Sequence, residues 1–162
     1  MAETRWLDER EQCAWRGYLA MNARLTAHLH RELQARSGLS LADFDVLVQL
    51  TDRPDHRARV LELAAALQWE KSRLSHHLAR MRHRGLVGRE DCIEDGRGTV
   101  VTLTPAGLRA IQEAAPAHVT TVREVFFDQL TAREVDTLRD FAERVLTRLD
   151  RPAGTTVPVA HP

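Results

Sequence analysis

Cysteine is scarce in this chain of 162 residues, which contains only Cys13 and Cys92. Two cysteines are too few for a disulfide framework, and their spacing matches no zinc-binding pattern. We therefore expect two reduced thiols, as is usual for proteins of the cytosol. The sequence assigns no metal ligands.

Long hydrophobic runs are missing as well. No apolar stretch approaches the roughly 20 residues that a helix needs to span a bilayer. The N-terminal segment MAETRWLDEREQ is charged and lacks the apolar core of a secretory signal. We therefore expect a cytoplasmic protein that has no membrane partner.

The residue patterns of catalysis are also absent. We find no nucleophile paired with a base and no set of metal ligands. The segment Gly96-Arg97-Gly98 is predicted to lie in a β-hairpin, whereas a nucleotide-binding glycine loop precedes a helix. Hydrophobic residues still make up 43% of the chain, which is enough for the core of one folded domain. We expect a protein that is not an enzyme and has no catalytic residues or cofactors.

Net charge is zero, since 23 basic residues balance 23 acidic ones, but the charges are unevenly distributed. Between Lys71 and Arg89 there are six Lys or Arg, three His and no acidic residue. A neutral protein that gathers its positive charge in one element is typical of one that holds this element against a polyanion.

Hydrophobic periodicity predicts a mainly α-helical chain with one small β-hairpin. Capping patterns at Ser40-x-x-Asp43 and Thr131-x-x-Glu134 open two of the helices. Threonine 104 followed by a proline is typical of another helix start. The periodicity predicts helices over about 7–35, 41–51, 60–67, 70–84, 105–129 and 132–149, and strands over about 86–89 and 99–103.

Proline and glycine mark the connections between these elements. Pro54 and the DHRAR run after it are expected to form a loop, and Gly85 is expected to cap the helix before it. Pro116 should kink or interrupt its helix near Gln112, because proline removes a backbone donor. The tail from Pro152 onward is expected to be disordered.

The basic helix at about 70–84 has two predicted faces. Leu74, Leu78 and Met81 recur at helical spacing and can anchor it to the core. With the short helix at 60–67 it forms a helix-turn-helix, whose second helix can present donors to bases in a major groove. The alternative is a solvated charged face on an ordinary helix. The candidate DNA-contacting residues of this helix are Lys71, Ser72, Arg73, Ser75, His76, His77, Arg80 and Arg84.

The hairpin adds a second candidate contact. Arg97 is flanked by glycines at the tip, so its guanidinium can project toward a narrow minor groove, whose negative potential attracts arginine. Asp95 can orient Arg97 through a charge-assisted hydrogen bond, or can form an Asx turn, and both can hold together.

These motifs resemble the MarR family of bacterial winged-helix regulators. The resemblance extends over about Trp15 to Leu149 and is most specific in SRLSHHLARMRHRGLVGRE followed by EDGRGTVVTLTPAG. The family's wing motif of Asp-x-Arg followed by Leu-Thr appears here as Asp95-Gly96-Arg97 and Leu103-Thr104. The implied fold class is mainly α with a β-hairpin wing, that is, a winged helix-turn-helix plus a helical dimerisation region.

The resemblance further implies a homodimer that binds double-stranded DNA at a palindromic operator. It divides the chain into an N-terminal dimerisation helix (1–38), a winged helix-turn-helix (39–103), C-terminal dimerisation helices (104–150) and a disordered tail (151–162). Residues between Val122 and Leu146 offer more apolar surface than one small winged helix would bury. The alternative is that they pack on the chain's own first helix.

The resemblance also implies a repressor that a small phenolic or anionic effector releases from DNA. An aromatic pair with polar groups fits a ligand pocket, although Trp15 and Tyr18 could equally be core residues of the first helix. In the family's urate-responsive branch, Asp45 has a counterpart, but His77 stands where that branch has arginine. The candidate effector-binding residues are Trp15, Tyr18, Asn22, Phe44 and Asp45.

Three alternatives remain open. Cys13 in the first helix, or Cys92 beside the wing, could make the chain a thiol-based redox-sensing regulator. His28 and His30 are poor metal co-ligands, because residues two apart do not share a helix face. The last alternative is a winged-helix module that binds proteins and never DNA. The positive charge of residues 71–89 argues against it, because the cores of protein interfaces are depleted of charged residues.

Overall fold

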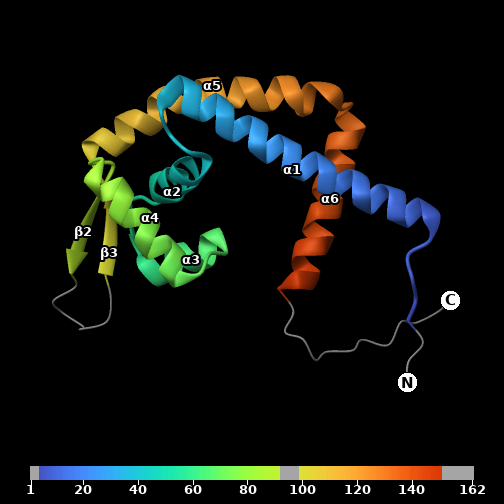
Figure 1. The fold of residues 1–162 in the computed structure, drawn as a ribbon, viewed down its shortest axis with the longest axis horizontal. Helices are drawn as coiled ribbons and strands as arrows, with labels where there is room; N and C mark the ends of the chain where they lie inside the picture. The colour runs from blue at the N-terminus through green and yellow to red at the C-terminus, as the bar shows by residue number, and fades with distance from the viewer. Residues whose placement is uncertain (1–3, 92–98, 151–162) are drawn as a thin grey trace. The chain divides into compact units, whose positions relative to one another are not determined.

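The computed structural model describes residues 4–91 and 99–150 and is mainly helical, with one small sheet (Figure 1). It comprises two compact units, residues 1–121 and 122–162. The predicted fold class, mainly α with a β-hairpin wing, is confirmed. The elements in order are α1 (Glu9–Ser37), α2 (Leu41–Thr51), β1 (Arg57–Arg59), α3 (Val60–Leu67), α4 (Lys71–His83), β2 (Val87–Asp91), β3 (Thr99–Leu103), α5 (Pro105–Val125), the 3₁₀ helix η1 (Phe127–Gln129) and α6 (Ala132–Leu149).

Local capping chemistry sets the helix boundaries in the first unit. Asp8 and Glu11 form a capping box at the start of α1, and Gly38 ends that helix in the left-handed conformation with φ 67°. The box predicted at the start of α2 is confirmed, since Ser40 Oγ accepts from the Asp43 backbone N–H at 3.0 Å and Asp43 Oδ2 accepts from the Ser40 N–H at 2.9 Å. The predicted bounds of α2 and α3 therefore agree with the structure.

The end of α4 and the start of the wing share a Schellman motif. Gly85 has φ 73°, and its N–H donates to the Arg82 carbonyl at 2.9 Å. The Leu86 N–H donates to the Met81 carbonyl at 3.0 Å, which completes the motif. The positive φ explains why glycine stands at this position, and the prediction that Gly85 ends the helix is confirmed.

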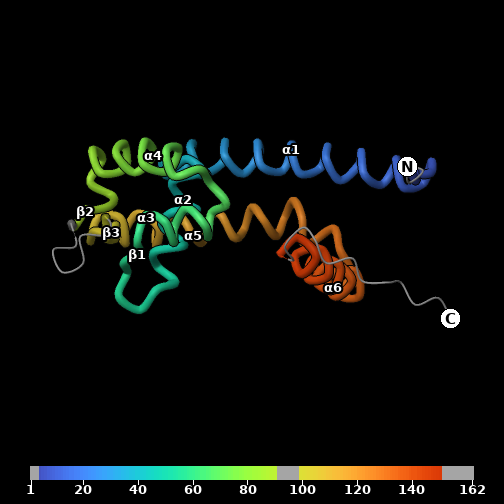
Figure 2. Tube along the Cα trace, turned by 90° about the horizontal axis from the view of Figure 1, so that it is seen from below, coloured from blue at the N-terminus to red at the C-terminus, as the bar shows by residue number. Residues whose placement is uncertain are grey.

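The expectation of a loop over the DHRAR run is wrong in its second half. Arg57–Arg59 forms β1, which pairs antiparallel with β3 (Figure 2). β2 pairs with the other edge of β3, so the sheet order is β1-β3-β2. Ala58 is buried opposite Val101, and this tertiary partner rather than any local signal makes the short segment a strand.

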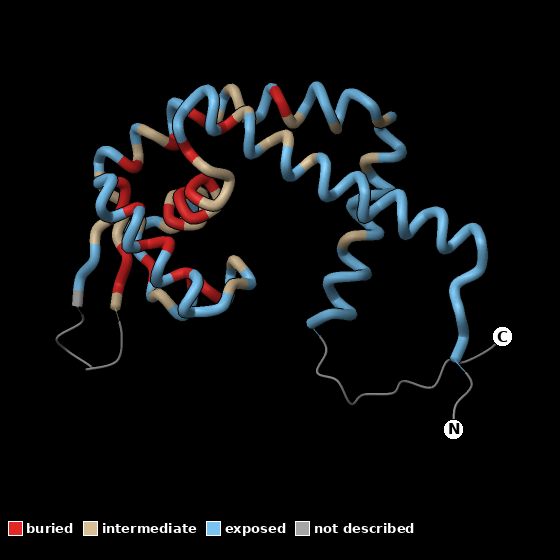
Figure 3. The backbone as a smooth tube through the Cα atoms, viewed as in Figure 1, coloured by how far each residue is buried: buried red, intermediate tan, exposed pale blue. Residues whose placement is uncertain are grey.

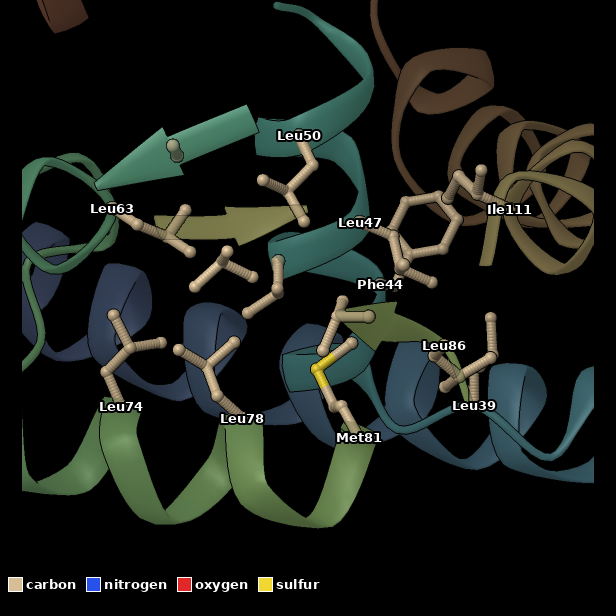
Figure 4. Close-up of a cluster of buried hydrophobic side chains, with 14 of the residues drawn as sticks. Leu39, Phe44, Leu47, Leu50, Leu63, Leu74, Leu78, Met81, Leu86 and Ile111 are labelled. Carbon is tan, nitrogen blue, oxygen red and sulfur yellow. The ribbon is translucent and has the colours of Figure 1, made fainter. Parts of the chain in front are cut away.

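The hydrophobic core lies between α2, α3, α4 and the sheet (Figure 3). The predicted anchor of α4 is confirmed, because Leu74 and Met81 are fully buried and Leu78 nearly so. Figure 4 shows these three side chains pointing from α4 into one cluster with side chains of α2 and α3. The main large residues of the cluster are Leu39, Phe44, Leu47, Leu50, Leu63, Leu74, Leu78, Met81, Leu86 and Ile111.

Helix α5 begins as predicted but ends earlier. Thr104 Oγ1 accepts from the Gly107 backbone N–H at 2.9 Å, which caps the first turn. The helix continues through Pro116, so the expected interruption does not occur. It ends at Val125, and the last four residues of the predicted helix contain the separate turn η1.

In the second unit, α6 has the predicted bounds and the predicted capping box between Thr131 and Glu134. Most of its large apolar side chains are exposed in the single chain, among them Phe141 at 51%, Leu146 at 58% and Leu149 at 72%. Within residues 4–91 and 99–150, no helix has both the length and the apolar character needed to cross a membrane. The predictions for the tail beyond Asp150 lie outside the described residues.

Candidate nucleic-acid interface

A tight corner between α3 and α4 builds the predicted helix-turn-helix. Gln68 adopts the left-handed conformation with φ 54°, and the Trp69 N–H donates to the Ala64 carbonyl at 2.9 Å. Three residues therefore reverse the chain, and α4 follows with its apolar side on the core. This anchoring decides which side chains of α4 face solvent.

Most of the predicted donors of α4 are exposed. We call these exposed residues, taken together, the donor face. The face carries guanidinium, ammonium, hydroxyl and imidazole groups, and α4 contains no acidic residue. Such groups suit base edges and phosphates alike. The donor face consists of Lys71, Ser72, Arg73, Ser75, His76 and Arg80.

Two of the predicted contact residues behave differently. His77 is buried at 7% exposure, and its Nε2 lies 3.1 Å from Oδ1 of Asp43 on α2. The Arg84 guanidinium donates to Asp43 Oδ2 at 2.7 Å and to the Gly38 carbonyl at 3.0 Å. The prediction that His77 and Arg84 belong to the DNA-facing set is therefore corrected, because their hydrogen-bonding groups are turned toward α2 and the end of α1.

Asp43 is the buried carboxylate that holds this contact together. Burial raises its pKa, but the His77 ring, the Ser40 backbone N–H, the Arg84 guanidinium and the Ser40 hydroxyl together lower it well below its usual range. The carboxylate thus stays charged at neutral pH. Sequence reasoning missed this residue because its partners on α4 lie more than thirty positions away.

An aromatic contact supports the N-terminal half of α4. The Arg73 guanidinium carbon lies 4.4 Å from the centroid of the Trp69 ring, a cation–π contact. The Trp69 ring in turn meets His77 edge to face, with centroids 5.5 Å apart. Arg73 is exposed but held by this stack, which restricts the directions that its guanidinium can take.

A cavity of about 320 Å³ lies between α3, α4 and the sheet, and we call it the basic cleft. The two predicted residues that line it are Lys71 and Ser75. Three arginines in its lining, Arg59, Arg82 and Arg89, were not predicted as site residues. Arg82 could have been found from the charge of α4 alone, whereas Arg59 and Arg89 join it only through the sheet.

The predicted wing-tip residues, Asp95 and Arg97, lie outside the described residues, as does Cys92. The strands that lead to the tip are described, and Gly88 on β2 lies opposite Thr102 on β3. A Cβ on Gly88 would lie 2.5 Å from Thr102 Oγ1 but 3.9 Å from the Thr102 carbonyl oxygen, so a larger residue there would have to displace the Thr102 hydroxyl and not the strand backbone.

The candidate effector residues do not form one pocket within a single chain. Trp15 and Tyr18 stack with centroids 5.7 Å apart, and both are about half exposed, so they are not core residues. Phe44 belongs to the same buried cluster as Leu33, which lies about 22 Å along α1 from Tyr18 at 1.5 Å per residue. Asn22 is exposed on the Tyr18 half of the helix.

Phe44 contacts a histidine ring, and Asp45 is a partly buried carboxyl. The Phe44 ring lies 4.4 Å from the ring of His118 on α5, and burial lowers the pKa of that histidine. Burial also raises the pKa of the Asp45 carboxyl. The α2 carboxylate that contacts α4 is Asp43, so Asp45 has no part in that link.

The structure shows the surroundings of two side chains considered for thiol and metal chemistry, Cys13 and His30. Cys13 is exposed on α1. His30 Nδ1 accepts from the Leu41 backbone N–H at 3.3 Å, which commits one ring nitrogen to the α1–α2 connection. Among residues 4–91 and 99–150, no three His, Cys, Asp or Glu side chains gather closely enough to hold a metal ion.

Comparison with known proteins agrees with this architecture. A model of the MarR family matches residues 37–98. The chain is 30% identical over 121 residues to the HTH-type transcriptional repressor YetL of Bacillus subtilis, covering 73% of this chain and 72% of YetL.

Two solved structures from Streptomyces coelicolor extend the similarity over nearly the whole chain. The MarR family regulator AbsC is 40% identical, with a TM-score of 0.85 over 90% of this chain and 98% of AbsC. Sco3205, solved in complex with DNA, is 36% identical, with a TM-score of 0.86 over 95% of this chain and 96% of Sco3205. The chain therefore belongs to the MarR family of DNA-binding transcriptional regulators, which are not enzymes.

Proposed function

We propose that the chain acts as a homodimeric repressor, which binds a palindromic operator through α4 and is released by a small phenolic or anionic effector. The donor face of α4, free of acidic residues and fixed on a buried apolar anchor, is the observation that carries the proposal. The name of YetL as a repressor supports repression rather than activation.

Within this proposal, α4 enters the major groove, where some of its exposed side chains contact bases and others contact phosphates. Ser72 and His76 lie on the side opposite the buried anchor and face the base edges, and Arg73 and Arg80 reach base edges from one flank. Lys71 and Arg82, at the basic cleft, contact phosphates. Asp95 and Arg97 remain the expected minor-groove contact of the wing.

Salt dependence tests the two cleft residues. Each phosphate neutralised contributes a slope of about −0.9 to a plot of log affinity against log salt concentration. Lys71→Ala and Arg82→Ala should each reduce the magnitude of that slope by about 1. Arg109→Ala is the matched control. Arg109 is exposed on α5, and its substitution removes one positive charge, as the other two substitutions do. Equal slopes for all three variants would contradict the assignment.

The dimer is proposed to form through residues 1–38 and 104–150, leaving 39–103 as the DNA-binding region and 151–162 as a tail. The exposed large apolar side chains along α1, and separately those along α6, support it, because monomeric proteins rarely leave large apolar surfaces in water. Phe141→Asp should convert the dimer to a monomer in light scattering, whereas Thr147→Asp on the polar side of α6 should not. A dimeric Phe141→Asp protein would refute this interface.

The effector site is proposed to draw on two copies of the chain. Tyr18 lies about 22 Å along α1 from Leu33 at 1.5 Å per residue, and Phe44 belongs to the buried cluster that contains Leu33, so a second copy is needed to bring the aromatic pair of α1 to Phe44. Burial raises the pKa of the Asp45 carboxyl, and this group can accept a hydrogen bond from a phenol hydroxyl. Binding of phenolic acids should raise the melting temperature, and Trp15→Ala should abolish that rise. No rise in the wild type would remove phenolic acids as effectors.

A further inference from the structure

Arg80 is the exposed arginine of the donor face whose guanidinium is bound to a buried side chain. Its Nη2 donates to Nδ1 of His77 at 2.9 Å. Arginine can only donate, so Nδ1 must accept and the ring proton lies on Nε2. The Nε2 atom lies 3.1 Å from Asp43 Oδ1. The chain of contacts thus runs from a buried carboxylate through a buried imidazole to an exposed guanidinium.

The two oxygens of Asp43 have separate partners. Oδ2 accepts from the Ser40 N–H at 2.9 Å and from Arg84 at 2.7 Å. Oδ1 faces His77, so the remaining oxygen is directed to the imidazole. The Asp43 side chain is only 4% exposed, and its anchoring at the start of α2 fixes the position of both oxygens.

The Nε2 contact of His77 has an unusual geometry. The atom is buried, and its approach to Oδ1 is too oblique for a regular hydrogen bond. A buried polar group with an imperfect bond calls for an explanation, since such groups are usually fully satisfied. Here the ring's other nitrogen makes the regular bond, to Arg80, and the T-shaped contact with Trp69 limits rotation of the ring.

We propose that His77 is a positioning residue for Arg80, held by Asp43 and Trp69, and that base discrimination by α4 depends on this buried histidine although it does not touch DNA. The proposal rests on the proposed function, in which Arg80 reads bases. A free arginine side chain samples many rotamers, and fixing its guanidinium before binding removes part of that entropic cost. The same bond turns the guanidinium in one direction, which favours one base over others.

Two substitutions test the contacts of the two His77 nitrogens one at a time. Asparagine places its amide where Nδ1 stands, so His77→Asn keeps an acceptor for Arg80 and loses the donor to Asp43. Glutamine places its amide where Nε2 stands, so His77→Gln keeps the donor to Asp43 and loses the acceptor for Arg80. The two variants have side chains of similar polarity, but His77→Asn keeps the contact with Arg80 and His77→Gln keeps the contact with Asp43.

The experiment is a double-mutant cycle with Arg80→Ala, read by fluorescence anisotropy on the operator and on operators with single base-pair changes. In the wild-type background, Arg80→Ala should weaken operator binding about tenfold or more and relax preference at one base pair. In the His77→Asn background the same loss is expected. In the His77→Gln background, Arg80→Ala should cost less than about threefold, and the base preference should already be relaxed.

The outcomes distinguish this inference from the proposed function. If Arg80→Ala costs the same factor in all three backgrounds, His77 is a packing residue only and the inference is overturned. If Arg80→Ala costs nothing in any background, the inference is also overturned, while His76→Ala still tests the proposed role of α4 independently. A positional effect, unlike a packing effect, changes base preference and not affinity alone.

A second measurement covers the case in which a His77 variant fails to fold. Nitrogen NMR of the histidine rings distinguishes the Nε2–H tautomer from the Nδ1–H tautomer. The wild type should show His77 in the Nε2–H form, because Nδ1 accepts from Arg80 and Nε2 lies beside the Asp43 carboxylate. In the folded Arg80→Ala protein the Nδ1 resonance should shift, because this nitrogen loses its donor. An Nδ1–H form in the wild type, or an unchanged Nδ1 resonance in Arg80→Ala, would overturn the coupling between the two residues.

Discussion

Asp43→Asn tests the buried contact between α2 and α4. The substitution removes the charge that faces His77 and Arg84 but keeps an acceptor for the Ser40 N–H, so the capping box largely survives. Arg84 is 41% exposed, so solvent screens its ion pair and little stability depends on it. The contact between Asp43 and His77 contributes more to stability, because Asp43→Asn leaves the His77 ring buried without its charged partner. We expect a loss of about 2 kcal/mol in the free energy of unfolding at pH 7.

The stability that Asp43 contributes should decrease as the pH is lowered. The pKa of Asp43 is lowered in the folded state, so its stabilisation is present above the ordinary carboxyl pKa of 3.8 and is lost as the pH falls below it. Urea denaturation at fixed protein concentration should therefore show the gap between wild type and Asp43→Asn shrinking between pH 5 and lower values. Asp52→Asn, at the exposed end of α2, is the control and should change little at either pH. A gap that stays constant with pH would refute the reasoning.

Two further predictions concern the packing that positions α4 and the wing. Leu74→Ala should lower the free energy of unfolding by about 2–5 kcal/mol in urea denaturation, because Leu74 is fully buried, whereas Leu61→Ala at 63% exposure should change it by less than about 0.5 kcal/mol; similar losses would contradict the core. Gly107→Ala should cost at least about 1–3 kcal/mol in the same assay, because its Cβ would lie 2.0 Å from a backbone carbonyl oxygen. Gly17→Ala, with nothing within 4 Å, should instead stabilise α1 by about 0.5–1 kcal/mol, and a destabilised Gly17→Ala would argue against that open environment.

The parts of the fold that sequence predicts well are those specified by neighbouring residues. Ser40 with Asp43, and Thr131 with Glu134, are complete signals within four positions, and the helices that they open have the expected bounds. Gly85 likewise identifies the end of α4 because its positive φ is a local requirement. Helical spacing also gave the buried side of α4.

The parts that sequence missed depend on distant partners. Arg57–Arg59 is a strand only because β3 is beside it, and its three residues carry no pattern of their own. His77 was predicted as a DNA contact because of its chemistry, although its spacing of three from Leu74 and four from Met81 places it on the buried side of α4; its partner Asp43 lies on another helix. The effector prediction combined residues of the N-terminal half of α1 with residues of α2, whose Phe44 belongs to the buried cluster that contains Leu33 near the other end of α1. Periodicity says which face a residue is on but not which neighbour it meets.

The central claim is that the exposed face of α4 binds operator DNA. The most direct test is the affinity of a triple variant, Ser72→Ala with His76→Ala and Arg80→Ala, for operator DNA by fluorescence anisotropy at fixed salt. With each base contact contributing about 1–3 kcal/mol, we predict a loss of at least about 100-fold on the operator, while binding to unrelated DNA and the melting temperature change little. Operator affinity equal to that of the wild type, in a folded protein, would contradict the account.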